Sequence, residues 1–169
     1  MLQQDFNKLT KVSLNLPFGI GGTEWEPDDT EKRAAWSLFI ELVTRVSIQP
    51  LEPEKDQGLM REALASLHSL FATTREILRE AGPDIGASHR SVGGIAITVL
   101  NQGLRPFLSK WHPSLQSWEA QRPLTISPQE HERNWKYEAQ LRTEMELLRR
   151  NLEEYAVALS VIAGVNYRH

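Results

Sequence analysis

The chain has 169 residues, of which 40% are hydrophobic and 24% charged, so it is long enough to bury a core in one domain. Its formal net charge of −3 gives no electrostatic footprint for general binding to DNA or to a membrane surface. Cysteine is absent, which excludes disulfides, thiolate metal sites and cysteine nucleophiles. We expect a cytoplasmic protein, because such a chain needs no oxidising compartment and its first residues lack the apolar core of a signal peptide.

Residues 1–27 are predicted to form an extended, β-like N-terminal arm. Apolar and polar side chains alternate from Val12 to Phe18, which is the period of a half-buried strand. Pro17 favours an edge position, because proline has no amide hydrogen to donate. Residues 19–22 are rich in glycine. The chain beyond them either pairs back as a short hairpin or crosses the helices as an extended arm.

Residues 28–169 are predicted to form an all-α domain, an antiparallel bundle of four main helices with a kinked third element. The first helix begins at the acidic and capping residues 28–31 and ends before Pro50. The second helix runs from about residue 56 to Ala81, where a glycine and a proline follow.

The third predicted helix contains two prolines. It begins near Ser88 and carries apolar side chains at helical spacing as far as Leu108. Pro106 should kink this helix or end it, and so change the relative phase of the side chains beside it, because proline removes one hydrogen bond and crowds the preceding turn. Pro113 predicts a second break, with a short separate helix over residues 114–120.

The last third of the chain has the strongest pattern. Seven apolar residues follow one heptad stripe from Leu141 to Ile162. Ser127 and Pro128 make a typical helix start, so the sequence predicts one unbroken helix to about Ala163. Such a helix is roughly 54 Å long at about 1.5 Å per residue. This length exceeds what a small bundle covers, and we therefore expect a partner: another copy of the chain or a larger protein.

A partner surface is predicted around this helix and three tryptophans. Indole N–H groups favour the partly wet rim of an interface, although corners of the core are the alternative position for the same side chains. The residues predicted to bind a partner are Trp111, Trp118, Trp135, Leu141, Met145 and Leu148.

No metal site and no cofactor are predicted. His131 lies between Glu130 and Glu132, but consecutive helical residues point about 100° apart. A metal site on a helix needs ligands three or four residues apart. His68 shares a face with apolar neighbours and is expected at the edge of the core. The glycines of residues 19–22 lack the spacing of a nucleotide-binding loop.

One short pattern points to chemistry. Arg105 and His112 are separated by six residues in the segment RPFLSKWH. This pair, in an all-helical domain, resembles the active-site signature of the HEPN superfamily of helical ribonucleases. The resemblance implies a metal-independent endoribonuclease, in which the histidine is the general acid or base, the arginine stabilises the phosphate, and a dimer interface forms the cleft. The whole chain also resembles small all-helical bacterial proteins, which implies no particular activity.

Two functions follow from these patterns. The first is a non-enzymatic accessory module that self-associates or docks a larger protein, and it needs only the helix faces described above. The second is a ribonuclease that acts on RNA with Arg105 and His112. Alternatively, Arg105 pairs with a carboxylate of the bundle and His112 packs into a corner. We expect the first function. The second requires Arg105 and His112 to lie on the same face of a helix although Pro106 stands between them.

Overall fold

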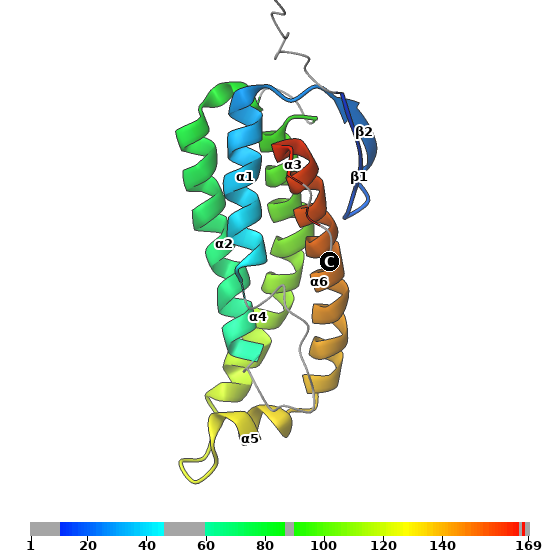
Figure 1. Cartoon of the computed structure of the whole chain (residues 1–169). Coiled ribbons are helices and arrows are strands. Elements are labelled where there is room, and N and C mark those ends of the chain that lie inside the picture. The colour runs from blue at the N-terminus through cyan, green and yellow to red at the C-terminus, as the bar shows by residue number, and fades with distance from the viewer. Residues whose placement is uncertain (1–10, 46–59, 87–89, 166, 168–169) are drawn as a thin grey trace, which may run out of the picture.

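The computed structural model describes residues 11–45, 60–86, 90–165 and 167. Most of these residues are helical, and the sheet among them is a two-stranded hairpin. The prediction of a mainly α-helical chain is confirmed in this broad sense. The four longest helices of the described part lie side by side along one direction (Figure 1).

The first two helices follow local sequence signals. Helix α1 (Asp29–Val43) is capped by Asp28, whose side chain accepts a hydrogen bond of 2.8 Å from a first-turn amide. Helix α2 (Met60–Ala81) ends at a glycine in the left-handed conformation. Helix α1 ends at Val43, with Thr44 as its C-cap, which is earlier than the end predicted just before Pro50. The predicted start of the second helix near residue 56 lies outside the described residues.

A continuous helical run with three parts comes next. It follows a short 3-10 turn, and its middle part is π-helical. The elements are η3 (Pro83–Gly86), α3 (Val92–Thr98), the π-helix η4 (Val99–Leu104) and α4 (Arg105–Glu119). Pro113 lies inside α4 without ending it, so the separate helix predicted over residues 114–120 is wrong. The carbonyl that loses its donor belongs to Ser109, which is exposed, so water can satisfy it.

The unbroken C-terminal helix predicted from Ser127 to Ala163 is also wrong. It is two helices, α5 (Pro128–Arg133) and α6 (Glu138–Ala163), and α5 crosses the lower end of the long helices (Figure 1). The turn between them buries Trp135 at 6% exposure, with its ring 5.9 Å from that of Trp111. Helix α6 has 26 residues, or about 39 Å. The excess length that suggested a partner is therefore absent.

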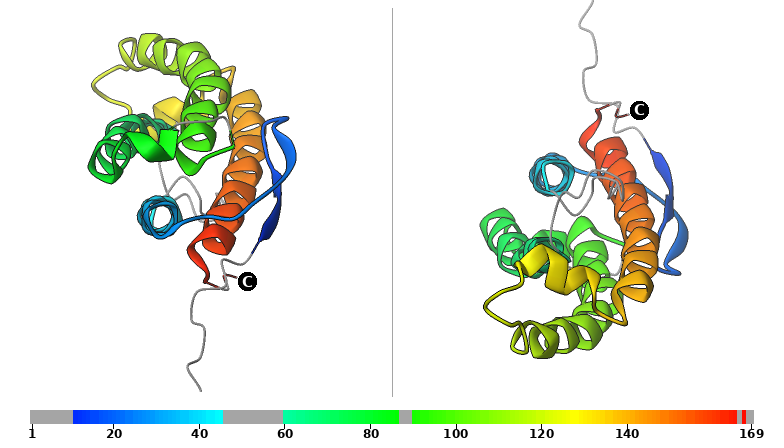
Figure 2. Two further views of the ribbon diagram at one scale, coloured as in Figure 1. Left: turned by 90° about the horizontal axis from the view of Figure 1, so that it is seen from above. Right: turned by 90° about the horizontal axis from the view of Figure 1, so that it is seen from below.

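The N-terminal arm is a hairpin. Strands β1 (Val12–Leu16) and β2 (Gly21–Trp25) pair antiparallel. The hairpin lies along α6 (Figure 2), and Leu14 and Leu16 point into the core at 7% and 5% exposure. Of the two alternatives for the arm, the hairpin is therefore correct. Pro17 begins the turn instead of lying within an edge strand.

The hairpin turn is fastened to the π-helix. Phe18 and Gly19 have φ angles of 59° and 75°, as the two central residues of a type I′ turn require. Such a φ is strained for phenylalanine. The Phe18 ring lies against Gly103 of η4, where an added Cβ would be 2.7 Å from a ring carbon. The Phe18 ring therefore packs directly on the backbone of η4, and a side chain at position 103 would make this ring shift.

Hairpin and helices share one hydrophobic core. The heptad stripe of α6 is buried in this core, since none of its seven members is more than 6% exposed. They are Leu141, Met145, Leu148, Leu152, Tyr155, Leu159 and Ile162. Within the described part of the chain, every helix is too short or too polar for a membrane span.

Gly93 allows α3 to approach the 3-10 turn closely. A Cβ at this position would lie 2.5 Å from the carbonyl oxygen of Ile85, a backbone atom that cannot swing aside. We expect Gly93→Ala to lower the free energy of unfolding by about 1–3 kcal/mol, although alanine favours helix. Urea denaturation measures this change. Gly86→Ala is the control, because no atom lies within 4 Å of its added Cβ. Equal losses in both variants would contradict the close contact.

Candidate functional site

An open groove lies between α2 and α4. Its volume is about 590 Å³, which suits a small ligand or a peptide segment. Two arginines and two histidines line it, and none of the described residues that line it is a carboxylate. Its floor is apolar, since Phe71 and Leu108 are buried. The full lining is His68, Ser69, Phe71, Ala72, Arg75, Arg105, Leu108, Ser109, His112 and Pro113.

Each helix contributes one face to this groove. The α2 residues lie between His68 and Arg75 and the α4 residues between Arg105 and Pro113, and each set contains residues that recur three or four positions apart. This spacing aligns side chains on one stripe of a helix. The pair Arg105 and His112 therefore lies on a common groove, two turns apart.

Pro106 does not separate the pair, and the expected change of phase between Arg105 and His112 is wrong. The proline stands at the junction of η4 and α4, where the amide of Arg105 already donates to the carbonyl of Leu100, five residues earlier. The wider π turn accommodates a residue that cannot donate to the carbonyl four positions back. The irregular backbone hydrogen bonding is thus confined to η4, and the α4 residues of the groove follow it on a regular helix.

Two guanidinium groups lie near one aromatic ring. The Cζ atoms of Arg105 and Arg75 are 5.1 and 5.9 Å from the centroid of Phe71. Arg105 also donates from Nε and Nη2 to the side-chain oxygen of Asn101, both at 3.2 Å. It therefore pairs with an amide oxygen and not with the carboxylate that was the alternative. Arg75 has no hydrogen bond or ion pair within the described part of the chain.

Arg61 and Glu119 hold His112 in one orientation. The Nη1 of Arg61 lies 3.0 Å from the Nδ1 of His112, and the same guanidinium forms a forked ion pair with Glu119 at 2.5–3.1 Å. A guanidinium only donates, so Nδ1 must accept and the ring proton lies on Nε2. The ring of His68 is 6.3 Å away. His112 is therefore a hydrogen-bond donor through Nε2.

The side chains predicted to bind a partner lie mostly inside the chain, which corrects that prediction. Five of the six are no more than 6% exposed. Trp118 is half-buried, and its indole N–H donates to the carbonyl of His131 at 2.7 Å. The indole N–H of Trp111 donates to Glu144 in the same way, so two of the three indole groups find their acceptors within the chain. The five buried residues are Trp111, Trp135, Leu141, Met145 and Leu148.

His131 and Glu132 are buried and hold α5 in place. The His131 ring stacks on Trp118 with centroids 4.2 Å apart. The Glu132 carboxylate accepts a 2.7 Å hydrogen bond from the amide of Met60 and so caps the start of α2. Burial raises the pKa of Glu132, although this hydrogen bond acts in the opposite direction. In the described part of the chain, no three side chains are placed to hold a metal ion.

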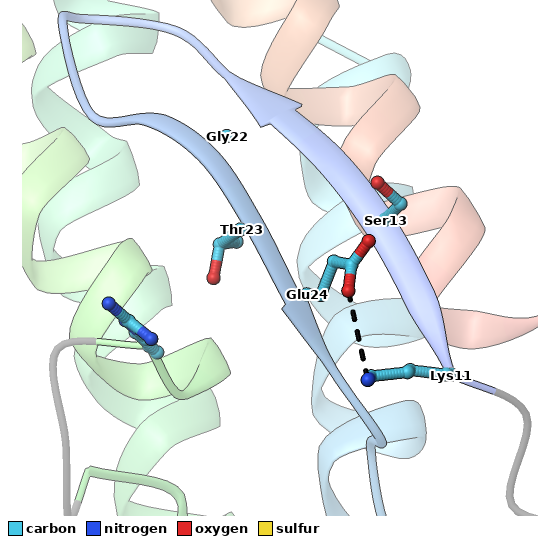
Figure 3. A pocket seen from close by; sticks show the side chains of 6 residues that line it. Lys11, Ser13, Gly22, Thr23 and Glu24 are labelled. Carbon is cyan, nitrogen blue, oxygen red and sulfur yellow. Dashed lines mark ion pairs between the residues drawn. The ribbon is translucent and has the colours of Figure 1, made fainter.

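A second open pocket, of about 510 Å³, lies beside the hairpin (Figure 3). Lys11 and Glu24 face each other across the two strands as an ion pair of 3.7 Å. The charged residues that line this second pocket are of both signs, and Lys11 and Glu24 pair with each other. Exposed positions of the two strands form much of its wall. We therefore place the candidate site in the groove. This second pocket is lined by Lys11, Ser13, Gly22, Thr23, Glu24 and Arg90.

Comparison of the chain with protein-family models, with curated proteins and with solved structures found no match. The case for a function therefore depends on the chemistry of the groove.

Sequence reasoning found half of the groove's basic side chains. It singled out Arg105 and His112, placed His68 at the edge of the core and did not consider Arg75. The signal was that Arg75 follows His68 by seven residues on one face of α2. This spacing indicates a binding site only once the structure places α4 opposite that face of α2.

Glu132→Gln tests the buried carboxylate. Its pKa is raised above the ordinary value of 4.5 in the folded state, so folding favours the protonated form. This stabilisation is present below the unfolded pKa and is lost as the pH rises through the folded pKa. We expect the free energy of unfolding of the wild type to fall relative to Glu132→Gln as the pH rises from about 4 to 8, measured by urea denaturation. A difference that stays constant with pH would contradict the raised pKa.

Proposed function

We propose that this protein is a non-enzymatic helical module that binds an anionic segment of a larger partner protein in its α2–α4 groove. The charge pattern of the groove carries the proposal: its described lining contains two arginines and two histidines and no carboxylate. The whole chain has a net charge of −3. A local positive groove on an acidic protein favours the binding of an anionic ligand and disfavours the binding of a cationic one.

The floor of the groove adds an apolar requirement. Phe71 and Leu108 form it at 8% and 7% exposure, and Pro113 borders it. Peptide recognition commonly combines an apolar pocket with charged side chains at its rim. A segment that carries both anionic and apolar side chains therefore fits better than a purely acidic one.

A separate partner fits this groove better than a second copy of the chain. In a symmetric pair joined here, the same surface would face itself. Arg75 and Arg105 of one copy would then approach those of the other, and like charges opposed in an interface are unfavourable. The self-association predicted from the sequence would need another face.

A peptide of alternating glutamate and leucine, labelled with rhodamine, tests the proposed binding. We expect it to bind the wild type, and the double variant Arg75→Ala/Arg105→Ala to bind at least about tenfold more weakly, because each charged hydrogen bond is lost. Added NaCl should weaken wild-type binding, since exposed charges are screened. Fluorescence anisotropy measures the Kd.

Arg150→Ala is the matched control for this binding experiment. Its side chain is 70% exposed on α6 and pairs with Glu146 at 3.4 Å, away from the groove. The control should bind as the wild type does. Equal affinity of the double variant and the wild type, or no binding by the wild type at low salt, would contradict the proposal.

A metal-independent ribonuclease is the second candidate, and the groove shared by Arg105 and His112 favours it. General acid–base catalysis needs a ring nitrogen that takes up or gives a proton at the reacting oxygen. The Nδ1 of His112 accepts from Arg61, and Nε2 then carries the proton. His112 can donate a hydrogen bond in this arrangement, but Arg61 must move before it can act as a base. We therefore favour ligand binding over RNA cleavage as the function of the groove.

RNA with hairpin and single-stranded segments, incubated in EDTA, separates the two candidates. A binding module predicts no cleavage by the wild type or by His112→Ala on a denaturing gel. A ribonuclease predicts wild-type cleavage that falls about 100-fold or more in His112→Ala. That second result, with circular dichroism unchanged, would overturn the proposed binding module. Equal cleavage by both proteins would exclude His112 as the catalytic group.

A further inference from the structure

We infer that the groove binds a phosphate monoester, the group carried by a phosphorylated side chain, between Arg75, Arg105 and the Nε2 of His112. This inference rests on the proposed function of the groove and names the chemical class of its ligand.

The two guanidinium groups near Phe71 call for a ligand with more than one negative charge. Arg75 and Arg105 contact the same ring, and among the residues that the structure describes no carboxylate lines the groove. A carboxylate or a phosphodiester carries one negative charge, and a carboxylate pairs well with one guanidinium fork. A phosphate monoester carries about −1.5 to −2 at neutral pH and has three acceptor oxygens. It therefore offsets both arginines at once.

The donors are arranged for such a ligand. Arg105 uses Nε and Nη2 on Asn101, which fixes the guanidinium plane and leaves Nη1 for a ligand. Arg75 donates to no group in the described part of the chain, so its whole fork is available. Charge-assisted hydrogen bonds from arginine are among the strongest that a protein offers a phosphate.

His112 supplies a third donor because of Arg61 and Glu119. These two residues are positioning residues: Arg61 occupies Nδ1 at 3.0 Å, and Glu119 holds Arg61 by its forked ion pair. The remaining ring nitrogen, Nε2, carries a proton and can donate to a phosphate oxygen. The histidine is thereby kept as a donor without needing a positive charge.

The groove is larger than a phosphate group. Its volume of about 590 Å³ continues over the apolar side chains of Leu108 and Pro113. An apolar or aromatic group attached to the phosphate would lie there. Phenyl phosphate combines both features and is the probe of choice.

Titration of the ¹⁵N-labelled full chain with phenyl phosphate, at constant ionic strength, tests the inference. We expect phenyl phosphate to bind at least about tenfold more tightly than benzoate or methyl phenyl phosphate, which have the same ring and one negative charge. Arg75→Ala and Arg105→Ala should each weaken binding about tenfold, and Arg150→Ala should leave it unchanged. Equal affinity for the three probes, or no effect of either groove variant, would overturn the inference.

The role of Arg61 has its own readout. The ¹⁵N shifts of the imidazole, measured at a pH of about 8 where histidine is mostly neutral, report which nitrogen carries the proton. We expect the Nε2–H form of His112 in the wild type, a mixture of both forms in Arg61→Ala, and weaker phenyl phosphate binding by that variant. An unchanged tautomer in Arg61→Ala would show that Arg61 does not position His112.

The peptide of glutamate and leucine separates this inference from the proposed function. Binding of that peptide without binding of phenyl phosphate overturns the phosphate inference and leaves the anionic groove standing. Failure of both ligands to bind overturns the inference and the proposed function together.

Discussion

The groove depends on the way one helical run accommodates a proline. Pro106 stands between Leu104 and Leu108, which are 1% and 7% exposed, so the run cannot end there without removing apolar side chains from the core. The π turn of η4 lets the chain remain helical across a residue that lacks an amide hydrogen. Gly103, in the same turn, receives the Phe18 ring of the hairpin. One local irregularity thus joins the hairpin, the core and the groove.

The groove is positive because its arginines have neutral partners. On α6, Arg142 and Arg149 pair with glutamates three or four residues away, and those pairs offset their charge. In the groove, Arg105 contacts a phenyl ring and an amide oxygen, and Arg75 contacts the same ring. Such contacts hold a guanidinium in place without cancelling its charge. A chain with a net charge of −3 therefore presents a local cationic surface.

The sequence predicted those parts of the fold that depend on local chemistry. The cap at Asp28, the glycine end of α2, the alternation of the hairpin and the heptad of α6 all appear in the structure. The break after α5 was missed. A proline and a serine cap signalled where that helix begins, but the burial of Trp135 against Trp111, which stabilises the turn, involves residues distant in the sequence. The same ambiguity placed core tryptophans on a predicted interface, because core and interface favour the same side chains.

For the candidate site, the sequence by itself determined only that Arg105 and His112 are seven positions apart, and the structure placed both on α4. They share a groove because the backbone irregularity caused by Pro106 lies in the π turn before α4. No residue pattern in the sequence specifies the hydrogen bonds of that turn. Arg75, Arg61 and Glu119 join the site only through the approach of α2 to α4. Helix faces and caps follow from short-range periodicity. The tertiary structure alone decided which faces meet, because that outcome is a property of the whole core.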